Sequence, residues 1–220
     1  MRAHCIIWLN VMSTQNRNRK YELKARAESQ ERTRQRIAKA AAELHEKVGP
    51  AETTVAEIAR RAGVSRLTVY KHFPDNAALY PACSAHYLSQ HPLPDFGAAL
   101  VTEEPVERVR SLLDAVYAGW YRDSRAMMRN LQRDRRLDPD LDAFMRDNGD
   151  AALAGLADAV TAGFELEPKR AARTRSMVRV ALDFWTWDRL DAEGVNDPEK
   201  VDLMTGAVAS VAGSEVASGR

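Results

Sequence analysis

The sequence predicts an all-α protein with two helical domains, the first of which contains a helix-turn-helix. Every strong apolar pattern recurs with a period near 3.6 residues, and none alternates as it would in a strand. Two short amphipathic segments meet at Gly63 within residues 54–73. A stretch with Pro92, Pro94 and Gly97 then breaks the pattern and marks a linker between two helical regions.

The first 30 residues are predicted to be a disordered basic extension. They are polar after a short apolar leader and hold few residues that a core would fix, while five basic residues follow in sequence: Arg17, Arg19, Lys20, Lys24 and Arg26. The alternatives are a DNA-contacting arm, an unordered tail, or a start codon assigned upstream of the true start at Met12. A first helix is expected from Arg32, with one apolar stripe that stops at Gly49-Pro50: Ile37, Ala40, Ala41, Leu44 and Val48.

The segment from Thr54 to Phe73 predicts two short helices and a tight turn. Thr54 and Glu57 form a capping box at the start of the first helix. Gly63 can adopt the left-handed conformation that ends it, and Ser65 can cap the second helix. A compact elbow of this kind exposes one helix for insertion into a DNA major groove. Residues 31–75 are therefore predicted to be a DNA-binding domain, with a connecting helix over 76–91.

Successive residues of an α-helix are 100° apart, so the residues of the second helix can be assigned to its inward face, its outward face or its flanks. Val69 and Phe73 point into the core, whereas Leu67, Thr68 and Lys71 face outward. Arg66 and Tyr70 lie on one flank and His72 on the other. The outward face is expected to contact bases and the flanks are expected to contact phosphates. Thr54, at a helix N-terminus where free N–H groups favour an anion, is expected to contact another phosphate.

The charge distribution supports this orientation. The net charge is only +1, but residues 1–91 carry 15 Lys and Arg against 8 Asp and Glu, a net of +7, and residues 92–220 carry 17 against 23, a net of −6. The basic half is the one expected to face a polyanion.

The region from about Arg32 to His91 resembles the TetR/AcrR family of one-component transcription regulators. The resemblance rests on the run from Thr54 to Leu79, above all the Gly63-Val-Ser65 turn with Tyr70, His72-Phe73 and Leu79 in register. It implies base contacts from Arg66, Leu67, Thr68 and Lys71, and phosphate contacts from Thr54, Tyr70 and His72. Asn76 departs from the family, which often has a basic residue at that position.

The same resemblance implies an all-helical C-terminal domain, over residues 92–220, that binds an effector and dimerises. Asp138 and Pro139 are placed to cap and begin one helix, and Pro168 and Asp197-Pro198 open two more. The segment Val178–Leu190 is apolar around most of its circumference and is predicted to be one buried helix. With the near-heptad spacing of the last helix, it predicts a homodimer seam that includes Val178, Trp187, Val201, Met204, Val208 and Val211.

An apolar effector pocket is predicted from aromatic and methionine side chains, which line adaptable sites as well as ordinary cores. The candidates are Trp120, Tyr121, Met127, Met128, Phe144, Phe184 and Trp185.

Cofactors and metals are not expected. The histidines His86 and His91 are five residues apart, on different sides of a helix, so with Asp95 they make a poor metal site. Cys5 and Cys83 fit a reducing cytoplasm, and no segment is apolar for long enough to span a membrane. Gly-rich phosphate loops and nucleophile elbows are lacking, so an enzyme is not predicted.

We expect a cytoplasmic, dimeric regulator that binds a palindromic operator under the control of a small molecule. Repression is the favoured direction of regulation. The first alternative is a structural DNA-binding protein that works without a ligand. The second is an all-helical enzyme in which the elbow serves only for packing.

Overall fold

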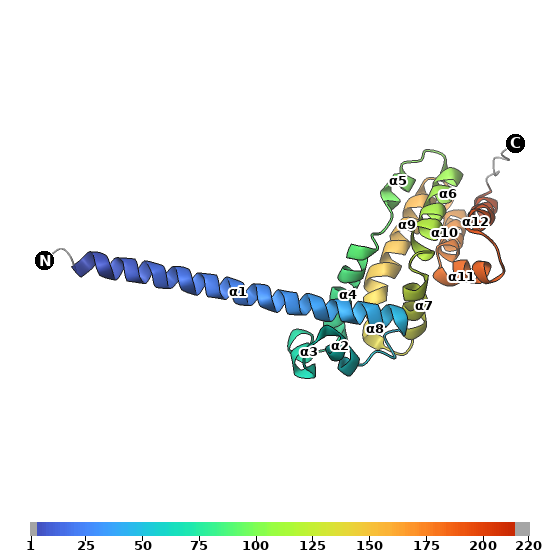
Figure 1. The fold of residues 1–220 in the computed structure, drawn as a ribbon. Helices are drawn as coiled ribbons and strands as arrows, with labels where there is room; N and C mark the ends of the chain where they lie inside the picture. The colour runs from blue at the N-terminus through green and yellow to red at the C-terminus, as the bar shows by residue number, and fades with distance from the viewer. Residues whose placement is uncertain (1–3, 214–220) are drawn as a thin grey trace.

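The computed structural model describes residues 4–213, with side chains from residue 23 onward, and this part of the chain is helical without a strand. The N-terminal half contains four helices: α1 (His4–Lys47), α2 (Val55–Ala62), α3 (Arg66–His72) and α4 (Asn76–Gln90). As Figure 1 shows, α1 projects far from the body, while α2 and α3 pack beneath its C-terminal part beside α4.

The C-terminal half is a bundle around a second core. Its elements are α5 (Phe96–Leu100), α6 (Pro105–Val116), α7 (Arg125–Asp134), α8 (Pro139–Met145), α9 (Ala151–Ala162), α10 (Pro168–Ala181), α11 (Phe184–Ala192) and α12 (Asp197–Ala212). Two π-helical segments, η1 (Tyr117–Tyr121) and η2 (Arg146–Asp150), continue α6 and connect α8 to α9. None of the helices described over residues 4–213 is both long and apolar enough to cross a membrane.

The first helix differs from the expected one. A disordered extension was expected over residues 1–30, but residues 4–31 are helical and continue into α1 without a break. Residues 23–31 are exposed, and they include Lys, Arg, Glu, Gln and Ala, which are good helix formers, so this part can be helical without packing against a core. An exposed pair between Lys24 and Glu28, 3.9 Å apart, adds i,i+4 support to this part of the helix. Residues 1–3 lie outside the described part.

The apolar segment Val178–Leu190 is not the single helix that was expected. Helix α10 ends at Ala181, and Asp183 caps α11 by accepting hydrogen bonds from the backbone N–H groups of Trp185 (2.9 Å) and Thr186 (3.1 Å). The break turns the chain, so apolar residues on both sides of it reach the core although a straight helix would place them around its whole circumference.

The two hydrophobic cores do not divide at the predicted linker. Three residues that follow the linker, Met127, Leu141 and Met145, belong to the core of α1 to α4. Trp120 packs against both cores. The N-terminal half is thus packed on α7 and α8 rather than joined to them only through a linker.

Candidate nucleic-acid interface

The elbow forms as the sequence predicts. Gly63 has φ 65° and ψ 42°, and its N–H bonds to the carbonyl groups of Ala59 and Arg60 at the end of α2. A Cβ at Gly63 would meet no atom within 4 Å, so the glycine is required for its backbone conformation and not for space. Ser65 caps α3 by accepting from the backbone N–H of Thr68 at 3.1 Å.

Helix α3 turns one face to the core and the other to solvent. Val69 and Phe73 are each 2% exposed and pack into the core of the N-terminal half. Leu67 is 79% exposed and Tyr70 is 53% exposed, and Arg66 and Lys71 are exposed beside them. A single exposed apolar side chain is common on protein surfaces, so the distinguishing feature of this face is that Leu67 and Tyr70 lie together with two cations. The inward and outward faces are therefore those predicted from the helical step, except that Thr68, which was expected to face outward, is half-buried.

Two of the predicted contact residues already use their hydroxyl groups. The Thr54 hydroxyl donates to a carboxylate oxygen of Glu57 at 3.0 Å and accepts from the Glu57 N–H at 3.2 Å. The Thr54 backbone N–H donates to the same carboxylate oxygen at 3.4 Å, which completes the capping box. The hydroxyl of Thr68 shares a hydrogen bond with that of Ser65 at 2.8 Å. A hydrogen bond from the Thr54 hydroxyl to a phosphate must replace its bond to the Glu57 carboxylate, whereas the Thr68 hydroxyl can donate elsewhere when Ser65 is the donor of the shared bond. The half-buried His72 completes the predicted set.

The position of α3 depends on Arg34, which the sequence analysis did not identify. Its guanidinium donates to the carbonyl oxygen of His72 at 3.1 Å and lies 4.3 Å from the centre of the Phe73 ring. The last carbonyl groups of a helix lack intrahelical donors, so an arginine from α1 stabilises this end of α3. A cation over an aromatic face adds further attraction.

Helix α7 holds the other end of the N-terminal half. The Asn130 amide donates to the carbonyl groups of His45 (3.0 Å) and Glu46 (2.8 Å) at the end of α1. The buried Asp134 carboxylate accepts from the N–H of Ala51 at 3.0 Å, and Arg133 donates to the Val48 carbonyl at 3.0 Å. Burial lowers the pKa of the adjacent His45 imidazole to about 4, so this ring is neutral at neutral pH.

Asn76, the departure from the family pattern, takes part in a contact between the two halves. Its amide donates to the Asp138 carboxylate at 3.0 Å, and the Tyr80 hydroxyl donates to the same oxygen at 2.5 Å. Asp138 also caps α8 through the N–H groups of Asp140 and Leu141. Burial acts to raise the pKa of Asp138, but these hydrogen bonds outweigh it, and the pKa lies below its usual value.

The seven residues expected to line an effector pocket lie in several places. Tyr121, Met127 and Phe184 are buried; Trp120, Met128 and Phe144 are half-buried; and Trp185 is 39% exposed. The hydroxyls of Tyr117 and Tyr121 both donate to carbonyl groups at the end of α10. Cavities of about 790, 430 and 110 Å³ lie among the described residues, and none of these three is lined by any of the seven.

The residues expected at a dimer seam are mostly in the core of a single chain, which differs from the prediction. Val178, Trp187, Val201, Met204 and Val208 are between 0% and 7% exposed, and only Val211 is half-buried. Helix α12 packs on α6 and α10 of its own chain, so its near-heptad stripe is covered there. A side chain that is buried within one chain is not available to a second copy.

Comparison with known proteins agrees with this geometry. The family model described as bacterial regulatory proteins, tetR family, matches residues 37–83. The chain is 42% identical over 97 residues to the HTH-type transcriptional regulator SrpR of Pseudomonas putida, a match that covers 43% of this chain and 44% of SrpR. It is also 42% identical over 97 residues to the uncharacterized HTH-type transcriptional regulator TtgW, likewise of Pseudomonas putida, covering 43% of this chain and 70% of TtgW.

Solved structures share the fold over most of the chain. A putative fatty acid metabolism regulator of Clostridium perfringens aligns with a TM-score of 0.56 and 16% identity, over 80% of this chain and 97% of that chain. A transcriptional regulator from Rhodococcus sp. Rha1 aligns with a TM-score of 0.55 and 20% identity, over 83% and 98%. Identities this low support the fold alone. The match to SrpR spans less than half of its length.

Proposed function

Since this chain belongs to the TetR family of bacterial transcriptional regulators, we propose that it binds a palindromic operator as a homodimer, represses transcription, and is released by a small-molecule effector. The observation that carries the DNA-binding part is the outward face of α3. Leu67 and Tyr70 are open to solvent on a helix whose opposite face is fully packed, and Arg66 and Lys71 flank them with cations.

We propose a role for each residue, supported by where it lies on α2 or α3. Arg66 and Lys71 are proposed to donate to guanine or phosphate, and Leu67 and Thr68 to contact thymine methyl groups. Tyr70, His72 and the N-terminus of α2 at Thr54 are proposed to contact phosphates, which fix the register without reading sequence. Thr54 is proposed to act mainly through the free N–H groups of its helix, because its hydroxyl is held by Glu57.

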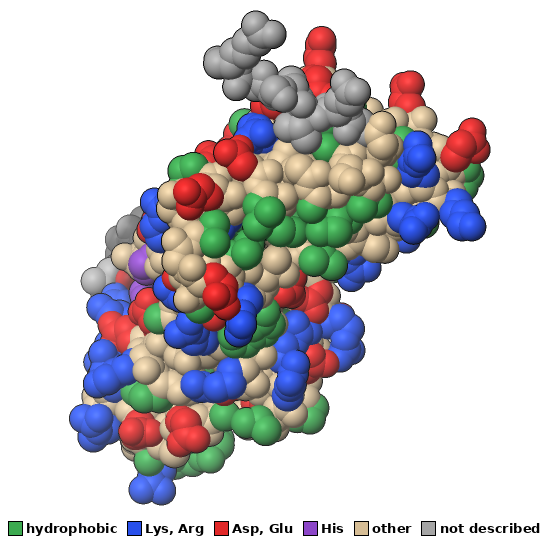
Figure 2. Space-filling view, turned by 90° about the vertical axis from the view of Figure 1, so that its right-hand side faces the viewer, with side chains coloured by type: hydrophobic (Ala, Val, Ile, Leu, Met, Phe, Trp, Pro, Cys, Tyr) green, Lys and Arg blue, Asp and Glu red, His purple; other side chains and the backbone are tan. Residues whose placement is uncertain are grey.

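For the homodimer we propose a surface on α10 and α12 that differs from the seam expected from the sequence. Arg170 near the start of α10 lies beside Gly213 at the end of α12, so the two helices run antiparallel. Val180 is 49% exposed on α10 and Leu203 is 53% exposed on α12. Figure 2, which views the molecule from the side of α11 and α12, shows hydrophobic side chains gathered in a band across this face. Covering such a band with a second copy removes it from water.

Dimer symmetry supports the choice of a palindrome. Two recognition helices that lie about 34–36 Å apart meet successive major grooves on one side of the duplex. An effector that favours a state with another separation weakens operator affinity by linkage. The contacts of α7 and α8 with the N-terminal half are the route that we propose for this coupling.

The test is DNA binding measured by fluorescence anisotropy, with the intergenic duplex beside the protein's own gene and an unrelated duplex of equal length. Replacing Lys71 by Ala should weaken operator binding by about 1–3 kcal/mol, roughly 5- to 150-fold, and relax base preference. Arg189→Ala, which removes an exposed cation from α11, is the matched control. Equal affinity for both duplexes, or equal effects of the two substitutions, would reject the proposal.

One observation favours a ligand-independent DNA-binding protein as a second candidate. The residues expected to line an effector pocket are divided between the two hydrophobic cores and, for Trp185, the surface, and the three cavities given above lie elsewhere. That candidate predicts little preference for the intergenic duplex over bulk DNA. The same anisotropy measurement therefore decides between the two.

A further inference from the structure

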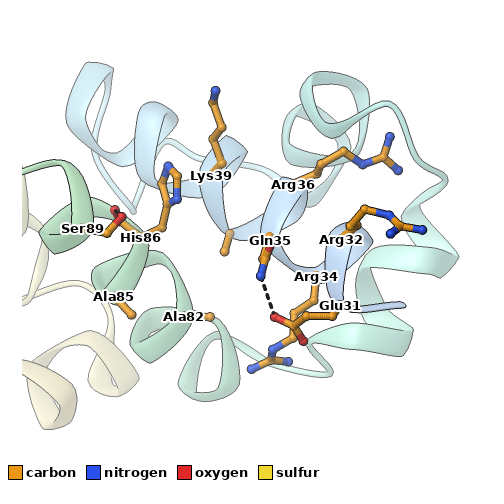
Figure 3. Close-up of a pocket in the computed structure, with 11 residues that line it drawn as sticks. Glu31, Arg32, Arg34, Gln35, Arg36, Lys39, Ala82, Ala85, His86 and Ser89 are labelled. Atoms are coloured by element: carbon orange, nitrogen blue, oxygen red, sulfur yellow. Dashed lines mark hydrogen bonds between the residues drawn. The ribbon is translucent and has the colours of Figure 1, made fainter. Parts of the chain in front are cut away.

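A basic groove lies between α1 and the second half of α4, away from the recognition helix. Its volume is about 790 Å³, within the range of small-molecule sites. Its walls come from residues 31–39 of α1 and 82–89 of α4, and no residue of α2 or α3 lines it. Figure 3 shows Lys39 of α1 near His86 of α4 and Arg34 on the side of Ala82, while Arg32 and Arg36 extend from the outer edge of the α1 wall.

The charge in the groove is poorly neutralised. Four cationic side chains line it, Arg32, Arg34, Arg36 and Lys39, against a single carboxylate, that of Glu31. Among the side chains that the structure describes, Arg32 and Arg36 form no ion pair, and Lys39 has only a long, exposed pair with Glu43 at 3.8 Å. An excess of unpaired guanidinium groups around a concave surface favours an anion there.

The shape of the groove leaves room for a ligand. Ala38, Ala82 and Ala85 stand between the charged residues, so short side chains keep the two helices from filling the space. Guanidinium groups bind phosphate through two parallel hydrogen bonds, and an ammonium group adds a point charge. We propose that this groove binds a small phosphorylated metabolite, and that its occupancy lowers operator affinity.

Arg34 is the link between this groove and the recognition helix. It lines the groove, and the same guanidinium holds the end of α3 through the His72 carbonyl and the Phe73 ring. A polyanion that draws Arg34 toward the groove competes with that carbonyl, so the end of α3 loses its partner. By linkage, a ligand that weakens DNA binding is itself bound less well when DNA is present. This inference goes beyond the proposed function, because it adds a second effector site outside the C-terminal half.

The experiment is isothermal titration of the full-length protein with sodium tripolyphosphate at constant ionic strength. The double substitution Arg36→Gln with Lys39→Gln should weaken binding at least tenfold. The matched control is Arg136→Gln with Arg189→Gln, which removes two exposed positive charges outside the groove and outside α10 and α12, and should leave binding unchanged. Circular dichroism and thermal unfolding establish that both double variants fold.

A second measurement tests the coupling. Tripolyphosphate should weaken operator binding by wild-type protein at least threefold, and Arg34→Gln should abolish that response while its folded state persists. Operator binding without tripolyphosphate is measured in parallel, so a failure of the proposed function is seen separately from a failure of the groove.

Four results would overturn the inference. Tripolyphosphate that gives no saturable heat excludes a site, and equal weakening in the two double variants assigns the effect to general charge attraction. In the third result, an unrelated DNA duplex displaces tripolyphosphate, and Arg36→Gln/Lys39→Gln loses as much affinity for the duplex as for tripolyphosphate. That result assigns the groove to the DNA-contacting surface. Binding of hexaglutamate as tight as that of tripolyphosphate assigns it to an acidic protein segment.

Discussion

Removing the Asp134 carboxylate should loosen the contact by which α7 holds the turn between α1 and α2. Asp134 is 1% exposed and accepts one hydrogen bond from the Ala51 N–H at 3.0 Å. It also accepts two from Arg133, at 2.6 and 3.1 Å. A hydrogen bond to a charged group contributes about 1.5–3 kcal/mol, which we apply to the Ala51 bond. The Arg133 side chain is 50% exposed, so solvent screens its pair to about 0–1 kcal/mol.

The variant Asp134→Ala should therefore lose about 2–3 kcal/mol of stability, because the desolvation of the buried carboxylate offsets part of the gain. For a chain of this size that corresponds to about 4–12 °C in the melting temperature. The assay is thermal unfolding followed by circular dichroism, with Asp158→Ala as control, since Asp158 forms only an exposed pair with Arg175 at 3.2 Å. A melting temperature indistinguishable from the control's would refute the argument that this contact joins the two halves.

Three further outcomes are expected. Leu203→Glu places a charge on the exposed face of α12 and should give monomers by sedimentation with weak operator binding; an intact dimer would place the interface elsewhere. Gly63→Ala should cost about 1–2 kcal/mol in unfolding free energy, because φ 65° disfavours a Cβ although space is open; an unchanged midpoint in urea would contradict this. The Lys200 hydrogen bond holds the pKa of Asp191 below its usual value. The ionised Asp191 carboxylate therefore stabilises the fold fully above its unfolded-state pKa of about 3.9, and this stabilisation is lost as the pH falls through its folded-state pKa. In Asp191→Asn the melting temperature should consequently fall less steeply as the pH is lowered through this range.

Features set by residues close together in sequence were predictable. The capping box at Thr54, the left-handed Gly63 and the cap at Ser65 all act over four positions or fewer, and the structure has each of them. The fold class and the outward face of α3 follow from the same short-range rules. The family membership rests on that segment too, because the family model matches residues 37–83.

Features that depend on distant partners were not predictable. In the sequence Arg34 is one of several cations on a charged helix. Its role becomes apparent only in the structure, where it contacts the His72 carbonyl and the Phe73 ring at the end of α3. The apolar spacing of α12 identifies a buried face but not what covers it, so Val208 was assigned to a partner although α6 and α10 of the same chain enclose it. The carboxylate of Asp183 is a common N-cap, and it was overlooked within an otherwise apolar run.

Helix α7 ties the two halves together because neighbouring residues on it point to different partners. Arg129 donates to both carboxylate oxygens of Asp188 on α11, at 2.6 and 2.9 Å, and the next residue, Asn130, donates to the carbonyl groups of His45 and Glu46 at the end of α1. One turn further, Asp134 holds the N–H of Ala51. A shift of α7 along its axis breaks directional bonds at one end or the other, and hydrogen bonds weaken steeply with misalignment. The position of the recognition helix relative to α11 is therefore set through α7, and a ligand that moves α11 must either carry the DNA-binding half with it or break these bonds.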